Sequence, residues 1–115
     1  MIEQWIWEIK RECPPDRLGM ILVHNGIVRA TSKQGKSVAG MKLSYDQAML
    51  DKAVRRFRNM EGIVDIRAWI NEGLLKVGDD IMYVCVAGRF RKDILPVFQE
   101  LITLIKAEIV REEEL

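Results

Sequence analysis

Short apolar or alternating segments rich in β-branched residues divide the chain into predicted strands. A strand buried on one face alternates apolar and polar residues, whereas a strand buried on both faces is apolar throughout. The run Ile81–Ala87 is of the second kind. Within Met20–Arg29, the glycine at position 26 marks a bulge or a close approach of another backbone. The predicted strands are Trp5–Ile9, Met20–Arg29, Val38–Tyr45, Ile63–Ile70, a short segment at Leu74-Leu75, and Ile81–Ala87.

Two segments show the three- and four-residue spacing of amphipathic helices. The first begins after Asp46, a favourable N-cap residue, and ends before Gly62, a typical helix stop. The second runs from about Asp93 to Glu108, and Pro96 is tolerated there if it lies in the first turn. The apolar faces are Met49, Ala53, Phe57 and Met60 in the first helix, and Ile94, Phe98, Leu101, Ile105 and Ile109 in the second.

The tail Arg111–Leu115 is polar and is expected to be solvated and frayed. No repeat or linker interrupts the pattern. The order of elements is three strands, a helix, three strands and a helix. It predicts a single α+β domain over residues 1–115, with two helices packed on a mixed or antiparallel sheet.

Composition narrows the classes of function. The chain has 115 residues, of which 49% are hydrophobic, so it can bury a core and is too apolar to be disordered. Its 18 Lys+Arg and 17 Asp+Glu leave a net charge of +1, which argues against a nucleic-acid binder. The balance is uneven, because the chain up to Met60 carries +5 and the remainder −4. The position of the basic residues therefore matters more than their number.

The sequence lacks the features that would indicate a membrane span, secretion or a zinc site. No apolar run reaches the ~18–20 residues of a membrane-spanning helix, and the first residues lack the basic region of a signal peptide. We therefore expect a cytoplasmic protein with no membrane partner. Cys13, expected in a loop, and Cys85, expected to be a small buried hydrophobe, are far apart. With one histidine they do not make a standard zinc site, and a disulfide is disfavoured in the cytoplasm.

Basic residues lie where predicted buried strands end. Arg29 ends one apolar strand and precedes a basic loop with Lys33 and Lys36. Arg91 follows the other long apolar strand, together with Arg89 and Lys92. Guanidinium groups at strand ends can converge on one phosphate or carboxylate, and the N-terminus of the following helix would add to such a pocket. The same pattern also fits ordinary solvated charges beside strands.

Lys106 lies in the most apolar part of the last helix. A lysine beside a buried face can be partly desolvated and serve as an acid, a base or a nucleophile. It can equally be a lysine whose stem covers apolar surface while its ammonium stays in water. His24, in a strand, is more simply interpreted as a structural histidine than a catalytic one, and Asp79-Asp80 as a turn.

In their order and spacing, these segments resemble the large, catalytic subunit of molybdopterin synthase, over about Gly19 to Lys106. The resemblance rests on four motifs and on Lys106, which falls on the lysine of the family's last helix. The first three motifs are Gly19-Met20 leading to Gly26-Ile27-Val28-Arg29, Val38 to Met49 with Leu43-Ser44-Tyr45-Asp46, and Gly73-x-Leu75-x-Val77-Gly78-Asp79-Asp80 followed by Ile81–Ala87. The fourth is Arg91, which falls where the family has the arginine of a His-Arg pair.

The resemblance implies an α/β hammerhead-type fold, a homodimer within a heterotetramer, and a small ubiquitin-like sulfur-carrier partner. It implies sulfur transfer from the carrier's C-terminal thiocarboxylate to cyclic pyranopterin monophosphate, which forms the dithiolene of molybdopterin. No metal or cofactor is implied, because the carrier brings the sulfur. Lys106 would be the catalytic residue. The substrate-binding set would be Arg29, Lys36, Arg91 and Arg111.

Several positions depart from the family's pattern. Phe90 stands where the family has a histidine beside Arg91, and Ile70-Asn71 stands at the family's earlier His-Arg pair. The family's second helix lysine has no equivalent, and Arg111 is the nearest residue to substitute for it. A homologue that binds the carrier or a phosphorylated pterin without turnover is therefore an alternative. A self-associating domain whose basic loop binds RNA is a third, which the near-neutral charge disfavours.

Overall fold

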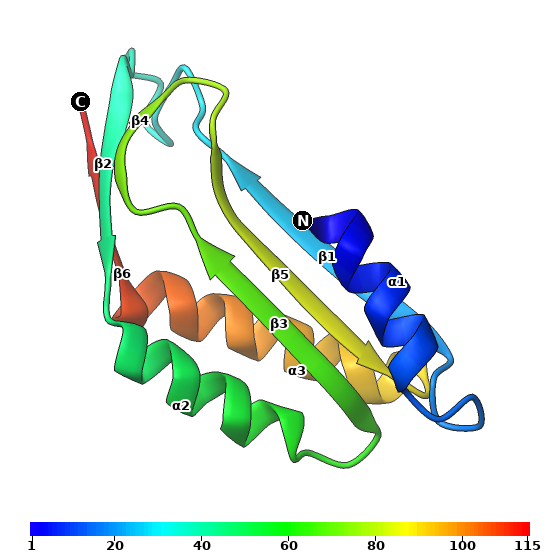
Figure 1. Ribbon diagram of the computed structural model, residues 1–115. Coiled ribbons are helices and arrows are strands. Elements are labelled where there is room, and N and C mark those ends of the chain that lie inside the picture. The colour runs from blue at the N-terminus through cyan, green and yellow to red at the C-terminus, as the bar shows by residue number, and fades with distance from the viewer.

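The computed structural model describes residues 1–115 and contains two three-stranded antiparallel sheets (Figure 1). The larger sheet has the order β1-β5-β3, with β5 (Asp80–Gly88) between β1 (Met20–Ile27) and β3 (Ile63–Ile70). Every residue from Val84 to Ala87 in the central strand is fully buried, as its continuous apolar run predicts. The register shifts between Gly26 and Ile27, which confirms the predicted bulge in β1.

The smaller sheet has the order β4-β2-β6 and stands at one end of the larger one (Figure 1). Its central strand β2 (Gly40–Tyr45) pairs with β4 (Gly73–Lys76) on one side and with β6 (Val110–Glu114) on the other. The predicted α+β class is confirmed. Both sheets are antiparallel, and there are three α-helices where two were predicted.

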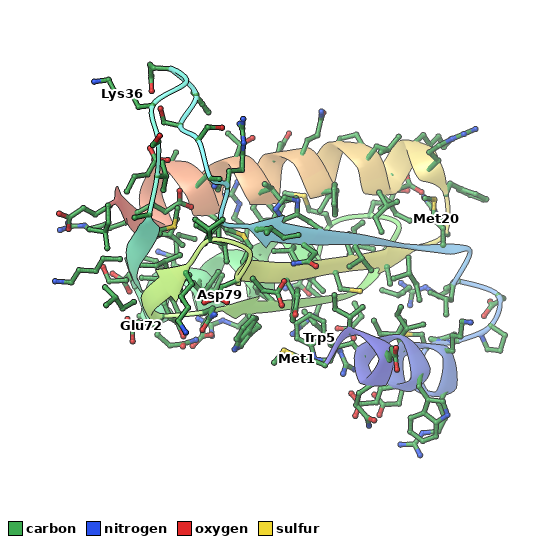
Figure 2. All side chains as sticks on the ribbon, turned by 90° about the horizontal axis from the view of Figure 1, so that it is seen from above. Met1, Trp5, Met20, Lys36, Glu72 and Asp79 are labelled. Carbon is green, nitrogen blue, oxygen red and sulfur yellow. The ribbon has the colours of Figure 1, made fainter.

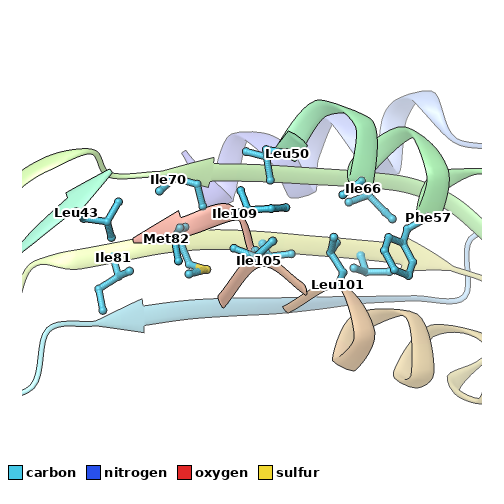
Figure 3. Packing of buried hydrophobic residues seen from close by; sticks show 14 of the residues in the cluster. Leu43, Leu50, Phe57, Ile66, Ile70, Ile81, Met82, Leu101, Ile105 and Ile109 are labelled. Atoms are coloured by element: carbon cyan, nitrogen blue, oxygen red, sulfur yellow. The ribbon is translucent and has the colours of Figure 1, made fainter. Parts of the chain in front are cut away.

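Two helices cover one face of the larger sheet and enclose the main core (Figures 1 and 3). Helix α2 (Gln47–Arg58) is capped as predicted, because the Asp46 carboxylate accepts a hydrogen bond of 3.0 Å from the backbone N–H of Met49. Helix α3 (Arg91–Leu104) runs beside it. Gly62 follows α2 after a short turn and has φ +83°, a conformation that favours glycine. No helix of the chain is long and apolar enough to cross a bilayer.

The predicted strand at Trp5–Ile9 is wrong, because these residues lie in helix α1 (Ile2–Glu12) on the opposite face of the larger sheet. Trp5 and Ile9 are four residues apart and share one side of the helix, and Ile9 is fully buried against Cys85 and Ala87. Glu3 in the first turn and Lys10 and Arg11 in the last also favour a helix. The apolar run was too short for its period to separate the two structures.

The end of the chain also differs from its prediction. Helix α3 gives way to a single π-helical turn, η1 (Ile105–Ile109), and the tail expected to be frayed is strand β6. Its side chains are mostly exposed, so its composition is polar, but its backbone bonds to β2. Pro96 lies in the second turn of α3, beyond the predicted first turn, because the helix begins at Arg91.

Candidate functional site

A pocket of about 310 Å³ opens where the two sheets meet. Its wall comes from the end of β1, the loop that follows β1, strands β2, β5 and β6, and the π-helical turn η1. The lining residues are Ile27, Arg29, Thr31, Lys33, Gln34, Met41, Ile81, Lys106, Glu112 and Glu114. Because its parts lie far apart in the sequence, the pocket depends on the meeting of the two sheets.

Lys106 enters the pocket from the π-helical turn. Ile105 and Ile109 flank it in sequence and point into the core beside Met82 (Figure 3), and Ile105 is fully buried. This anchoring keeps Lys106 on the outer side of the turn, where its side chain remains 45% exposed. Its ammonium donates a hydrogen bond of 2.8 Å to the Glu112 carboxylate. Single π-turns inside helices occur often at functional sites.

Arg29 reaches the same pocket from just beyond the end of β1. Its backbone neighbour Val28 is buried and bonds to Asp79 through its N–H, which holds the chain at this point. The Arg29 guanidinium has one side-chain hydrogen bond, of 3.4 Å to the Thr31 hydroxyl, and no carboxylate partner. It is therefore free to bind an anion.

The charges that line the pocket are mixed. Three are positive, from Arg29, Lys33 and Lys106, and two are negative, from Glu112 and Glu114. An arrangement of this kind attracts anions, but weakly compared with a purely basic pocket. It is suited to a single phosphate or carboxylate.

His24 lies next to this region on β1. It is half-buried, and its ring meets the Phe98 ring of α3 edge-on at 6.4 Å between centroids. Burial, and to a lesser degree the positive charge of Lys106, lower the pKa of the His24 imidazole below its ordinary value of 6.5. His24 is therefore mainly neutral at pH 7.

The other candidate residues lie elsewhere. Arg91 is the first residue of α3, and a 14-residue helix rises roughly 21 Å at about 1.5 Å per residue, so Arg91 and Lys106 are at opposite ends. Lys36 is at the tip of the loop after β1, directed away from the body (Figure 2). Arg111 lines a separate pocket with Ser44, because successive residues of β6 face opposite ways.

Of the predicted site residues, the structure thus brings together Arg29 and Lys106 and separates Lys36, Arg91 and Arg111 from them within one chain. The expectation that Arg29, Arg91 and Lys106 meet at one pocket of a single chain is wrong. The reason is that Arg91 is the first residue of α3, whereas Lys106 lies in the turn after its last residue, so the length of the helix separates them. The roles of these residues toward a substrate stay predictions.

Sequence reasoning missed the two glutamates of the pocket. Glu112 and Glu114 belong to a run of three acidic residues, for which composition predicts a solvated tail. Their spacing of two is the one available signal, since alternate residues of a strand share a face. That signal is useful only once the tail is known to be a strand.

Neither the cysteines nor a metal ligand set contribute to the pocket. Cys85 is fully buried, as predicted, and burial raises the pKa of its thiol to about 11. Cys13 follows α1, and both cysteines are free thiols. No three His, Cys, Asp or Glu side chains gather in a way that would hold a metal ion.

The sequence matches one family model over almost its entire length. The model describes the MoaE protein and covers residues 4–108. The chain belongs to the MoaE protein family. Among curated proteins, this MoaE-family chain is 28% identical over 94 residues to an uncharacterised protein of Methanocaldococcus jannaschii, covering 78% of this chain and 79% of that one.

Solved structures share the fold of the MoaE-family chain at low identity. Molybdopterin synthase from Staphylococcus aureus superposes with a TM-score of 0.80 at 18% identity, over 100% of this chain and 84% of that one. A complex of subunits 1 and 2 of the molybdopterin-converting factor from Helicobacter pylori gives 0.76 at 17%, over 98% and 74%. Molybdopterin cofactor biosynthesis protein E from Burkholderia multivorans gives 0.74 at 21%, over 99% and 80%. The resemblance in fold expected from the sequence is confirmed.

Proposed function

We propose that this chain acts in molybdenum cofactor biosynthesis as the large subunit of a molybdopterin synthase. It would transfer sulfur from a thiocarboxylated ubiquitin-like carrier to cyclic pyranopterin monophosphate. Membership of the MoaE family supports the pathway, and the solved complex of two subunits from Helicobacter pylori supports a small protein partner. The observation that carries the proposal is the pocket shared by Lys106 and Arg29.

The pocket suits the two anions of this reaction. The substrate has a phosphate and the carrier ends in a thiocarboxylate, and the guanidinium of Arg29 and the ammonium of Lys106 can bind one such group each. The volume of about 310 Å³ is at the lower end for small-molecule sites, so it admits one small anionic group with a short segment attached.

Each sulfur transfer is a net exchange of one carrier sulfur for one substrate oxygen. A carbon–sulfur bond to the pterin side chain forms and a carbon–oxygen bond of that side chain breaks. On the carrier, the acyl–sulfur bond breaks and an acyl–oxygen bond forms, so that the carrier ends as a carboxylate. The exchange needs no oxidant or reductant. Lys106 would supply and remove protons at the reacting sulfur and oxygen, or form a bond to the acyl carbon, and would stabilise the negative charge that develops there.

In this proposal, Arg91 acts in the pocket of a second copy of the chain. The resemblance implies both that Arg91 binds substrate and that the subunit is a homodimer, yet Arg91 is roughly 21 Å from Lys106 along α3. Both statements are compatible if Arg91 of one subunit reaches the pocket of the other. Phe90, next to it, is 55% exposed and is available for such a contact.

The test is a reconstituted reaction with the purified chain, a thiocarboxylated carrier and cyclic pyranopterin monophosphate, in which dithiolene product is measured by mass spectrometry after alkylation. Lys106→Met should lower the rate by about 100-fold or more, the usual scale for a proton-transferring side chain. Lys42→Met is the matched control, because Lys42 is exposed on the strand that contributes Met41 to the pocket but faces away from it. Equal activity of wild type and Lys106→Met would contradict the assignment.

A second candidate function is binding of the carrier or of a phosphorylated pterin without turnover. It is favoured by the pairing of Lys106 with Glu112 and by the position of Arg111, which lines another pocket and does not replace a second lysine. Carrier binding by calorimetry, together with no dithiolene product from the wild-type chain, would support this function over the first.

A further inference from the structure

The ammonium of Lys106 is already paired in the unliganded pocket. Its partner is the Glu112 carboxylate, at 2.8 Å, and Glu112 is the less exposed of the two side chains, at 22% against 45%. Arg29 and Lys33, the other cations that line the pocket, have no carboxylate partner. Glu112 therefore forms an ion pair with one cation of the pocket, and the other two cations have no carboxylate partner.

The local fold produces this pair. After the π-helical turn the chain becomes extended at Val110 and enters β6, and the side chains of Lys106 and Glu112, six residues apart, meet there. Pairing of Glu112 with Leu43 in the smaller sheet sets the position of the carboxylate. Glu114, two residues on, lines the same pocket and makes no ion pair.

A carboxylate at this place resembles the ligand that the pocket would take. A phosphate or a C-terminal carboxylate binds an ammonium at the same distance and with the same geometry as the glutamate side chain does. Both oxygen groups draw on the same three N–H donors of one lysine. An anion that binds Lys106 must therefore displace Glu112 or share the ammonium with it.

We propose that Glu112 is an internal competitor for Lys106, a residue that weakens anion binding in the pocket and so sets its selectivity. This inference rests on the proposed function, because it takes Lys106 to be the group that meets the ligand's anion. It adds that the acidic strand β6 is part of the site. In the resting pocket Glu112 holds Lys106 in place, and a ligand with further contacts is needed to release it.

The expected effect is modest, because Lys106 is nearly half exposed and solvent weakens the pair. Removing the competing charge should tighten anion binding by about threefold to fivefold. A free small anion would gain most from that removal, since it has no other contacts with which to overcome the competition.

Inorganic phosphate is a suitable probe, followed through the backbone amide signals of Thr31 and Lys106 in NMR titrations. The variants are Glu112→Gln and, as a matched control, Glu114→Gln, which removes the same charge from the same pocket without touching Lys106. Both are then repeated with Lys106→Met. Circular dichroism and thermal unfolding check that all four chains fold.

The competition predicts that Glu112→Gln tightens phosphate binding at least twofold more than Glu114→Gln does, and that this excess disappears with Lys106→Met. Equal gains in phosphate binding from the two variants would overturn it, because the gain would then come from the reduced negative charge of the pocket as a whole. Weaker binding by Glu112→Gln, or no phosphate binding by wild type and Glu112→Gln, would overturn it as well.

A turnover experiment separates competition from a merely structural role. In the reconstituted reaction, Glu112→Gln should lower KM for the carrier, by a smaller factor than the gain in phosphate binding, and this change in KM should exceed any change in kcat. A structural role would lower kcat. If the wild-type chain forms no product, the proposed function fails while the phosphate titration still decides the competition.

Discussion

Basic residues lie at the start of helix α3 and in the π-helical turn that follows it, and the lysine of that turn, Lys106, lines the pocket with Arg29. At the first end, Arg89 pairs with Asp93 at 2.9 Å and with Glu61 at 3.2 Å, and Phe90 is exposed. At the other end, the π-helical turn brings Lys106 to the junction of the two sheets, where Arg29 arrives from β1. The difference lies in what surrounds the charges, since both ends have cations.

This contrast teaches that a run of basic residues is not enough to predict an anion site. Arg89, Arg91 and Lys92 lie within four consecutive residues at the surface, where ion pairs contribute little. Arg29 and Lys106 are distant in sequence and meet in a cavity. Charges interact more strongly where the surrounding protein excludes water.

The largest expected effect is a loss of stability when the residue that anchors the π-helical turn after α3, Ile105, is truncated. Ile105 is fully buried, so Ile105→Ala should lower the free energy of unfolding by about 2–5 kcal/mol, through lost apolar contacts and a cavity. Leu95 near the other end is 43% exposed, and Leu95→Ala should cost less than about 0.5 kcal/mol. Urea unfolding measures both. A loss below about 1 kcal/mol for Ile105→Ala would mean that the turn is not held by the core.

Mixing variants tests whether the two ends work together across a homodimer. Lys106→Met and Arg91→Met should each lose sulfur transfer, but when unfolded and refolded together they should regain about a quarter of the wild-type rate, because half the dimers then contain one intact site. The control mixture is Lys106→Met with Arg29→Met. These two residues share the pocket of one chain, so no intact site can form and activity should not return. Equal recovery in both mixtures would reject the shared site.

Substitution of Gly62 tests how tightly the chain before β3 packs against Asp93 in the first turn of α3. Its φ is +83°, and a Cβ built there lies 2.4 Å from the Asp93 carboxyl carbon, so Gly62→Ala should lower the free energy of unfolding by about 1–3 kcal/mol. Gly35 has φ +81° but open space around it, and Gly35→Ala should cost about 1 kcal/mol. If both variants lose the same stability, the contact with Asp93 contributes nothing measurable.

The smallest expected effect is the pH dependence due to His24, beside the pocket end. Its folded-state pKa is lowered from 6.5, first by burial and then by Lys106, so the unfolded chain binds a proton more readily than the folded one. Stability should therefore fall as the pH drops below about 6.5, and His24→Phe should remove that part of the loss. Because His24 is the one histidine in the chain, NMR titration reports it directly. A measured pKa above 6.5 would contradict this account.

Elements with a long and regular pattern were predictable from the sequence. Strand Ile63–Ile70 and the cap of α2 at Asp46 agree with the structure, because burial and capping act locally on residue type. The short apolar run at Trp5–Ile9 was not predictable, because five residues do not separate a strand from a helix. Strand β6 was missed because its backbone pairs with a strand more than 60 residues away, and its side chains show no sign of that pairing.

The sequence by itself determined the α+β class, the family resemblance and the choice of Lys106 and Arg29 as candidates, because each depends on residue type and spacing along the chain. Only the tertiary structure decided which cations share a pocket. The length of α3 keeps Arg91 out of the pocket of its own chain, and the pairing of β6 with β2 brings Glu112 into it. The physical reason is that electrostatic interactions depend on distance in space, and the packing of two sheets and a helix sets those distances.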